Sequence, residues 1–259
     1  MITAGVDVGF ETIQAVIIQD GKILGRACGL SAGGYQTYRV EAVWQEALTF
    51  AKITANDVEK VAATGEGKEV VAFAQKRITE PLAEAKAGKY YFPQATSVVD
   101  VGADQVRVVT IGQKDGAIDE FVLNQKCAAG VGAFLKDFAI RRLGWTLEQL
   151  SALPHNVAGD SMVSDGCRVF AELDALSLLN HGKSPQVVAG AVVEAMAVRI
   201  SSVLKDKVRP ARDTTVLLGG VAKNKALVAA LQVRTGISFL IPDDACYGCA
   251  VGAALIAAN

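Results

Sequence analysis

The sequence predicts an α/β protein built from a duplicated domain. Two hairpin patterns that each open with Asp-x-Gly, and apolar helical segments between them, support this prediction. The first pattern opens at Asp7 and the second at Asp100, 93 positions later (100 − 7). Because the second pattern repeats the first, we predict two similar domains, residues 1–92 and 93–259, divided where Pro93 interrupts the pattern.

Both hairpins are predicted from alternating apolar runs that flank an Asp-Gly pair. The first runs through residues 13–18, turns at Asp20-Gly21 and returns through residues 23–24. The second runs through residues 106–111, turns at Asp115-Gly116 and returns through residues 118–122. Asp-Gly between two apolar runs is a strong signal for a tight hairpin turn.

Helical patterns occupy the rest of the chain. Residues 40–53 are amphipathic, and residues 188–204 place an apolar side chain at every fourth position, which lines one face of a helix. The uncharged stretch 245–259 is interrupted by Gly248 and Gly252 and is shorter than the roughly 20 apolar residues that a membrane span needs. We therefore predict a buried helix there.

Composition and charge argue against several classes of protein. Hydrophobic residues make up 51% of the 259 residues and charged residues 20%, which argues against disorder. Lys and Arg (26) balance Asp and Glu (27), so the basic excess typical of nucleic-acid binding is missing. Residues 1–9 lack the pattern of a secretory signal. We expect a cytoplasmic protein with no nucleic-acid or membrane partner, whose five cysteines are reduced thiols or metal ligands.

Three glycine-containing turns suggest a nucleotide site. They are Asp7-Val8-Gly9, Asp100-Val101-Gly102, and the run 217–224, in which an apolar strand enters Gly219-Gly220 and then a helix. Glycine lets a phosphate approach the backbone, and a helix N-terminus attracts anions. Two aspartates could hold a hydrated Mg²⁺ between them. A single Asp-x-Gly could merely close a turn, but the duplication and the later Gly-Gly favour a ligand site. Neither a P-loop nor a complete dinucleotide fingerprint is present.

These turns resemble the nucleotide-binding superfamily of actin, the heat-shock chaperones and the sugar kinases. The resemblance implies two similar α/β domains with ATP in the cleft between them. It makes the two hairpins the phosphate loops and Gly219-Gly220 the adenosine loop. The catalytic residues would then be Asp7 and Asp100, and the residues implied to bind the nucleotide are Gly9, Thr12, Gly102, Ala103, Gly219, Gly220 and Asn224.

Two cysteines each precede a helical pattern. Cys127 lies before apolar residues at 134, 135, 138 and 139, and Cys167 lies before a pattern that continues to Leu179. A helix N-terminus lowers the pKa of a thiol and favours the thiolate, which binds iron–sulfur clusters. Placement alone does not decide between cluster ligands and buried cysteines that pack as small apolar groups.

The stretches 126–134 and 167–179 resemble the ATPase components of benzoyl-CoA reductases and the activators of 2-hydroxyacyl-CoA dehydratases. Residues 63–68, 78–80 and 219–224 match the same family, so the similarity covers most of the chain. The resemblance implies a four-iron four-sulfur cluster that bridges two subunits, each giving two cysteines, here Cys127 and Cys167. It also implies ATP hydrolysis that drives a low-potential electron from ferredoxin or flavodoxin into an acyl-CoA reductase or dehydratase partner. The second subunit would be an identical chain or a paralogous ATPase subunit.

The first loop differs from the activator pattern. Activators carry a Ser/Thr-rich loop that ends in Lys, whereas residues 9–14 read Gly-Phe-Glu-Thr-Ile-Gln, so only Thr12 keeps a hydroxyl. The second loop, 102–105, reads Gly-Ala-Asp-Gln where activators have Gly-Gly-Gln-Asp. Both differences favour a benzoyl-CoA reductase-type subunit over a dehydratase activator.

We expect Cys246 and Cys249 to be structural thiols beside a small-residue terminal helix, and Cys28 to belong to the core. A small-molecule kinase on the same fold would leave the cysteine motifs unexplained. A scaffold with a degenerate nucleotide site would account for the altered first loop.

Overall fold

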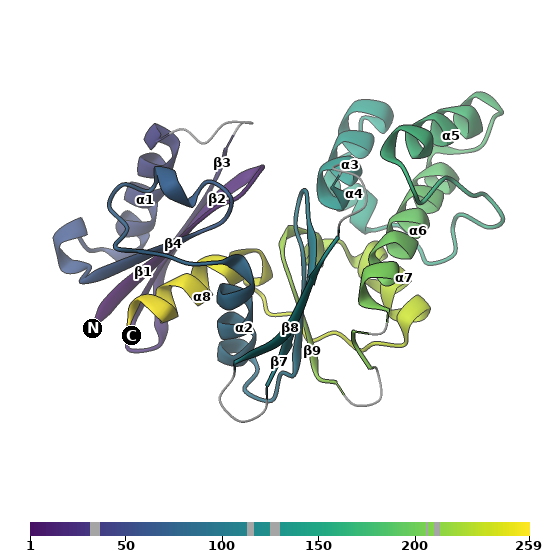
Figure 1. Cartoon of the computed structure of the whole chain (residues 1–259). Helices are drawn as coiled ribbons and strands as arrows, with labels where there is room; N and C mark the ends of the chain where they lie inside the picture. The colour runs from purple at the N-terminus through teal and green to yellow at the C-terminus, as the bar shows by residue number, and fades with distance from the viewer. Residues whose placement is uncertain (32–36, 113–116, 125–129, 206, 210–212) are drawn as a thin grey trace. The chain divides into compact units, whose positions relative to one another are not determined.

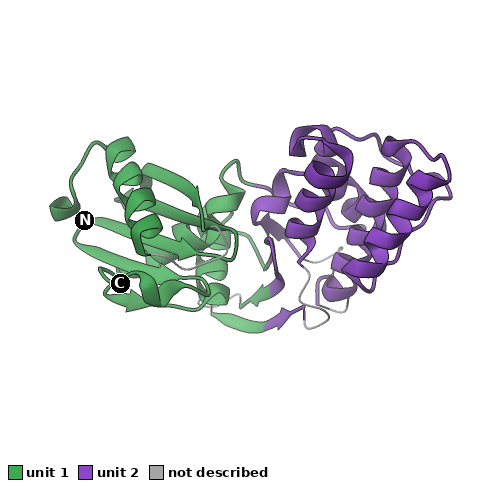
Figure 2. Cartoon of the chain, turned by 90° about the horizontal axis from the view of Figure 1, so that it is seen from above, with its two compact units in different colours: residues 1–98, 109–120, 242–259 green, residues 99–108, 121–241 purple. Residues whose placement is uncertain are grey.

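The computed structural model describes residues 1–31, 37–112, 117–124, 130–205, 207–209 and 213–259. The turn expected at Asp115-Gly116 and the predicted ligand Cys127 lie outside these residues. The described chain forms two sheets (Figure 1) and two compact units (Figure 2). Unit 1 comprises residues 1–98, 109–120 and 242–259, and unit 2 comprises residues 99–108 and 121–241. The units therefore interleave along the chain, and the predicted division into repeated halves after residue 92 stays a prediction.

Unit 1 is built on a five-stranded sheet with the order β3-β2-β1-β4-β5. β1 pairs antiparallel with β2 and parallel with β4. The turn between β2 and β3 has φ +49° at Asp20 and +79° at Gly21, as a tight hairpin turn with two left-handed residues requires. The first predicted hairpin is therefore confirmed. The strands are β1 (Ile2–Val8), β2 (Thr12–Gln19), β3 (Lys22–Leu30), β4 (Lys60–Thr64) and β5 (Lys76–Arg77).

Helices cover both faces of this sheet. The helix α1 (Thr37–Ala51) packs its buried residues Val43 and Trp44 against the face that carries Val6 and Val8. The opposite face packs against α2 (Glu80–Tyr91) and α8 (Gly248–Ala257). A Cβ at Gly5 would overlap the carbonyl oxygen of Ala250, so α8 lies directly on β1. The predicted buried terminal helix is confirmed, and its small residues permit this close approach.

The second sheet repeats the order of the first. Its strands follow the order β8-β7-β6-β9, which corresponds to β3-β2-β1-β4. The strands of the second predicted hairpin are present, although its turn lies outside the described residues. The four strands are β6 (Ser97–Val101), β7 (Val106–Ile111), β8 (Ile118–Leu123) and β9 (Thr215–Leu218).

The remaining α-helices of the described residues belong to unit 2. They are α3 (Val131–Asp137), which continues into the π-helical turn Phe138–Leu143, and α4 (Leu147–Ser151), α5 (Arg168–Asn180), α6 (Pro185–Leu204) and α7 (Lys225–Thr235). By length and composition α6 is apolar enough to cross a membrane, but 67% of its most apolar window is buried inside the structure. Such burial is typical of the central helix of a folded core.

Candidate functional site

The two Asp-x-Gly loops are closed by the same backbone hydrogen bond. In the first loop the amide of Gly9 donates to the carbonyl of Thr12 over 2.9 Å. In the second loop the amide of Gly102 donates to the carbonyl of Gln105 over 3.0 Å. Both donor and acceptor are 93 positions apart between the loops (102 − 9 and 105 − 12). The repeat that the sequence predicts is therefore reproduced at the level of individual backbone bonds.

Each unit also packs one left-handed glycine against its Asp-x-Gly loop. Gly65 follows β4 with φ +87°, and Gly219 follows β9 with φ +90°. A Cβ at Gly65 would lie 2.5 Å from the carbonyl oxygen of Val8, and one at Gly219 would overlap the backbone of Val101. Val8 and Val101 are again 93 positions apart (101 − 8). Sequence reasoning assigned Gly219 to the site, whereas Gly65 appeared only within the family match 63–68 and was not assigned to the site.

Different side chains stand seven residues after each aspartate. In unit 2 this residue is Arg107 (107 − 100), whose Nη2 lies 3.6 Å from Asp100 Oδ1. The exposed fractions of these side chains are 12% for Arg107 and 8% for Asp100, so the ion pair is nearly buried. In unit 1 the corresponding residue is Gln14 (14 − 7), a neutral amide. The two repeats therefore place different charges beside their aspartates.

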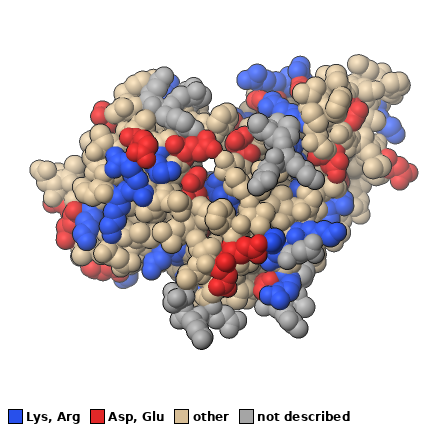
Figure 3. All heavy atoms as spheres, in the orientation of Figure 1, with Lys and Arg blue, Asp and Glu red and all other residues tan. Residues whose placement is uncertain are grey.

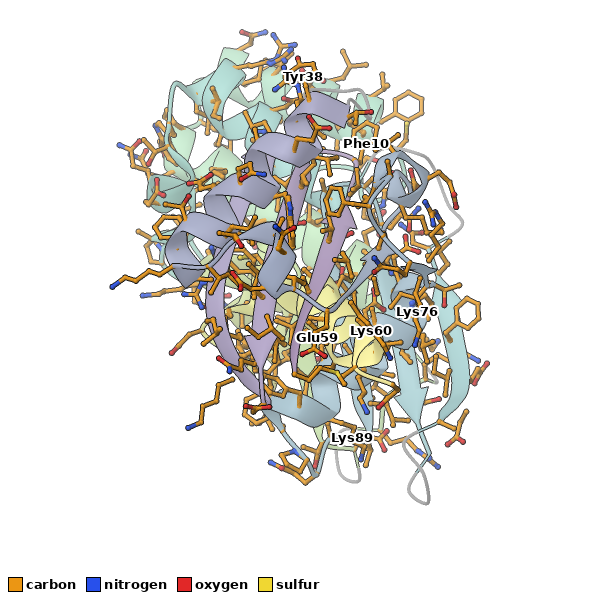
Figure 4. All side chains as sticks on the ribbon, turned by 90° about the vertical axis from the view of Figure 1, so that its left-hand side faces the viewer. Phe10, Tyr38, Glu59, Lys60, Lys76 and Lys89 are labelled. Carbon is orange, nitrogen blue, oxygen red and sulfur yellow. The ribbon has the colours of Figure 1, made fainter. Side chains whose placement is uncertain are left out.

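A row of polar side chains crosses the unit 1 sheet at Asp7. Asp7 pairs with Gln14 on β2 and with Thr64 on β4, and Gln14 pairs with Cys28 on β3. Directly opposed residues on neighbouring strands point to the same face of a sheet. We call these four residues the polar row. The row lies near the end of β1. Figure 4 labels Phe10 just beyond this end of the sheet, and Glu59 and Lys60 at the opposite end, where β4 begins.

Cys28 is exposed, so the expectation that it belongs to the core is wrong. It lies on β3, the edge strand of the sheet, where neighbouring side chains cover less of the surface. Two residues earlier on the same strand, Arg26 forms an ion pair with Asp244 and lies 5.3 Å from the centre of the Tyr247 ring. Burial raises the pKa of Tyr247, and the thiols of Cys28 and Cys246 add to this rise. The exposed end of the polar row thus lies near the beginning of α8.

The other two cysteines of unit 1 differ in burial. Cys249 is buried in α8, and its Sγ lies 3.7 Å from Oε1 of Glu84 on α2. Cys246 is half-buried in the turn that precedes α8. The position of Cys249 is typical of a structural thiol, as the sequence predicts.

Three predicted loop segments meet within unit 2. The amide of Ala133 at the start of α3 donates to the carbonyl of Ala103 over 2.9 Å. A Cβ at Gly132 would lie 2.6 Å from the carbonyl oxygen of Gly102 and 3.0 Å from Cγ2 of Val221. The loop after β6, the beginning of α3 and the turn after β9 therefore form one cluster of backbone.

The predicted nucleotide residues after β9 have distinct environments. Gly219 is buried, whereas Gly220 is exposed and has no atom within 4 Å of the position that a Cβ would take. Asn224 caps α7, because its Oδ1 accepts from the amide of Leu227 over 3.0 Å. Gly220 thus offers open space for a ligand, while the Asn224 side chain stabilises the helix end.

Cys167 occupies the N-cap position of α5 and is half-exposed. This agrees with the predicted placement at a helix N-terminus, and its role as a ligand stays a prediction. The first two turns of α5 expose Val169, Phe170 and Leu173 by 61%, 60% and 56%. Arg168 pairs with Asp137 of α3 over 2.6 Å. A thiol is the donor type that an iron–sulfur cluster requires, and here it lies beside an exposed apolar surface.

Charged side chains of both signs are interspersed on the face drawn in Figure 3. The backbone at the glycine-containing turns can bind an anionic ligand. The carboxylates of Asp7 and Asp100 stand two positions before Gly9 and Gly102 in the chain. Two sheets share one order of four strands, and each has an Asp-x-Gly loop that is closed by a backbone hydrogen bond and packed against a left-handed glycine. These features define a duplicated α/β fold with a candidate nucleotide site.

Comparison with known proteins identifies the family. The profile of the BadF/BadG/BcrA/BcrD ATPase family matches residues 4–257, and the chain belongs to this family. It is 32% identical over 259 residues to the activator of lactoyl-CoA dehydratase from Anaerotignum propionicum, covering 99% of this chain and 97% of the relative. It is 30% identical over 268 residues to a benzoyl-CoA reductase subunit from Thauera aromatica, covering 98% and 92%.

Solved structures confirm the predicted fold class. The activator of the 2-hydroxyisocaproyl-CoA dehydratase from Clostridium difficile, solved with bound ADPNP, matches with a TM-score of 0.86 and 27% identity over 99% of this chain and 94% of that chain. A ROK family glucokinase from Streptomyces griseus matches with a TM-score of 0.60 and 16% identity over 100% and 99% of the two chains, which shows the fold alone. The chain therefore has the two-domain fold shared by activator ATPases and sugar kinases.

Proposed function

We propose that the chain is an ATP-hydrolysing iron–sulfur protein that drives low-potential electrons from ferredoxin or flavodoxin into an acyl-CoA reductase or dehydratase. Membership of the ATPase family and the names of its relatives support this proposal. The single observation that carries the electron-transfer part is Cys167, half-exposed at the N-cap of α5 beside an apolar surface.

Mg²⁺-ATP would bind through both Asp-x-Gly loops. In unit 1 the proposed residues are Asp7, Gly9 and Thr12, and Gly9 and Thr12 already form the hydrogen bond that closes the loop. In unit 2 they are Asp100, Gly102, Ala103, Gly219, Gly220 and Asn224. Exposed backbone at Gly220 would admit the nucleotide, and the carboxylates would place the metal and the attacking water. Because Arg107 places a positive charge beside Asp100, whereas the corresponding Gln14 of unit 1 is neutral, we assign the larger share of metal binding to Asp7.

The cluster would bridge two subunits. One chain supplies Cys127 and Cys167, whereas a four-iron cluster takes four thiolates. Exposed apolar side chains that gather beside a candidate ligand are typical of a contact with another protein. We therefore propose a homodimer, or a pair with a paralogous ATPase subunit, joined at the beginning of α5.

Two partner enzymes are supported by different observations. The neutral Gln14 and the altered second loop favour a benzoyl-CoA reductase-type partner. The TM-score of 0.86 with a dehydratase activator favours a 2-hydroxyacyl-CoA dehydratase. Either role places the chain in the cytoplasm without a nucleic-acid or membrane partner.

Iron and sulfide analysis of anaerobically purified protein tests the proposal. We expect Cys127→Ser and Cys167→Ser each to abolish cluster assembly, because a site of four thiolates is then incomplete. Cys246→Ser and Cys249→Ser are matched controls that should keep the cluster. Loss of iron in the control variants alone would show that the ligands are assigned wrongly. Reconstitution with a dehydratase and with a reductase would then decide between the two partners.

A further inference from the structure

We propose that Gln14 is a positioning residue that holds a water molecule of a Mg²⁺ ion bound at Asp7. The inference deepens the proposed nucleotide site and rests on it. Its starting point is a buried hydrogen-bond acceptor. The exposed fraction of Gln14 is 7%, and its Oε1 has no hydrogen-bond partner within the described part of the chain.

The other end of the amide is already engaged. Nε2 of Gln14 donates to Oγ1 of Thr12 over 2.6 Å, so the side chain is held in one orientation. Asp7 stands directly opposite Gln14 on β1. Side chains in such a pair share a face and have Cβ atoms about 5 Å apart. The fixed amide is therefore a neighbour of the carboxylate that is proposed to bind the metal.

The helix α8 adds a second feature to this end of the sheet. The Thr3 hydroxyl donates to the carbonyl of Ala254, and Gly5, two residues later, lies against Ala250. Later residues of β1 therefore lie closer to the N-terminus of α8. Asp7, two residues further along β1, lies at that end. The N-terminus of α8, a helix of 10 residues, favours negative charge nearby. A metal-bound phosphate group would be stabilised in this place.

The chemistry of Oε1 selects the ligand. A carbonyl oxygen accepts hydrogen bonds and cannot donate them. Fully ionised phosphate oxygens offer no proton, so the triphosphate itself would leave the acceptor unsatisfied. Mg²⁺ keeps several water molecules when it binds carboxylates and phosphates, and each of these waters is a donor. A metal-bound water is thus the part of the complex that fits Oε1.

The second repeat shows what a charged residue does at this position. Arg107 corresponds to Gln14 and forms an ion pair with Asp100. A cation opposite the carboxylate competes with a metal ion for the same negative charge. Gln14 introduces no positive charge opposite Asp7. Its Oε1 can instead accept a hydrogen bond from the neutral metal-bound water.

Binding of a fluorescent ADPNP analogue, measured over a Mg²⁺ titration and again in EDTA, tests the inference. We expect Gln14→Met to raise the Mg²⁺ midpoint about tenfold, the effect of one unmade buried hydrogen bond, and to leave the affinity in EDTA unchanged. Gln14→Glu keeps the acceptor and adds charge, so its midpoint should equal or fall below that of the unsubstituted protein. Gln45→Met makes the same exchange on the exposed side of α1 and is the matched control.

Two other outcomes would overturn the inference. If Gln14→Met weakens binding equally with Mg²⁺ and in EDTA while Gln14→Lys strengthens both, the amide binds phosphate directly. If the Mg²⁺ midpoint does not move in Gln14→Met, the residue has no contact with the metal shell. Either result leaves the proposed function intact, whereas failure of the unsubstituted protein to bind the nucleotide would overturn both.

Discussion

The hairpin of Asp7 and the hairpin of Asp100 are alike in backbone and unlike in charge. Both close their loops with the same hydrogen bond, and both receive a left-handed glycine against the second residue of Asp-x-Gly. The residue seven positions after the aspartate is Gln14 in one and Arg107 in the other. The duplication therefore preserves the shape of the loops, whereas the charges of their side chains have diverged.

The largest expected effect concerns stability in the second hairpin. Arg107→Met removes one partner of a nearly buried ion pair and leaves the carboxylate of Asp100 in place. We expect the free energy of unfolding to fall by about 3 kcal/mol. Urea denaturation measures this free energy of unfolding. Gln14→Met, the substitution at the corresponding position of the first hairpin, is measured for comparison. A loss of equal size in both variants would mean that the two hairpins are energetically equivalent.

The second effect is a lower rate of ATP hydrolysis when Asp7 of the first hairpin is substituted. Asp7→Asn should lower the ATPase rate roughly a hundredfold, because the carboxylate is proposed to hold the metal that stabilises charge at the phosphoryl group. Nucleotide affinity should change much less. Steady-state ATPase assays and binding titrations separate the two quantities. If Asp100→Asn slows turnover as strongly while its fold stays intact, the assignment of the metal mainly to Asp7 is wrong.

The left-handed glycines provide a comparison in which both hairpins should respond alike. Gly65→Ala and Gly219→Ala should each destabilise the fold by about 2 kcal/mol, because φ is positive and the added Cβ meets backbone. Gly220→Ala enters open space and should stay within about 0.5 kcal/mol of the unsubstituted protein. It should instead weaken nucleotide binding by steric intrusion. Unchanged affinity for Gly220→Ala would remove this residue from the proposed site.

The smallest expected effect is a change in thiol reactivity. Cys28 ends the polar row that contains Gln14 and Asp7, and its side chain is exposed. Mg²⁺-ADPNP should slow alkylation of Cys28 a few-fold relative to the protein in EDTA. Mass spectrometry of the Cys28 peptide after brief iodoacetamide treatment measures the rate. Equal rates would show that the ligand does not approach this end of the row.

Local patterns predicted the elements that depend on neighbouring residues. The hairpin strands, the helix after Cys167 and the terminal helix follow from alternation, Asp-Gly pairs and small-residue runs. The ion pair of Arg107 with Asp100 and the opposition of Gln14 to Asp7 were not predicted, because each depends on the side chains that strand pairing brings together. Gly65 was not assigned to the site for the same reason, since its partner Val8 is 57 positions away (65 − 8). The exposure of Cys28 depends on which strand forms the sheet edge.

The contact between β1 and α8 has a consequence for how the protein is made. Gly5 and Ala250 are 245 positions apart (250 − 5). At about 5–20 residues per second, a ribosome needs roughly 12–50 s to add the helix after the strand has emerged. Throughout that time the face of β2 that carries Val16 and Ile18 lacks the cover that α8 provides in the finished fold, and only Tyr90 and Tyr91 of α2 are available to pack near it among the described residues of the later helices. All residues of unit 2, 99–108 and 121–241, are synthesised before α8, so unit 1 is the part of the nascent chain that stays incomplete longest and most needs protection by chaperones.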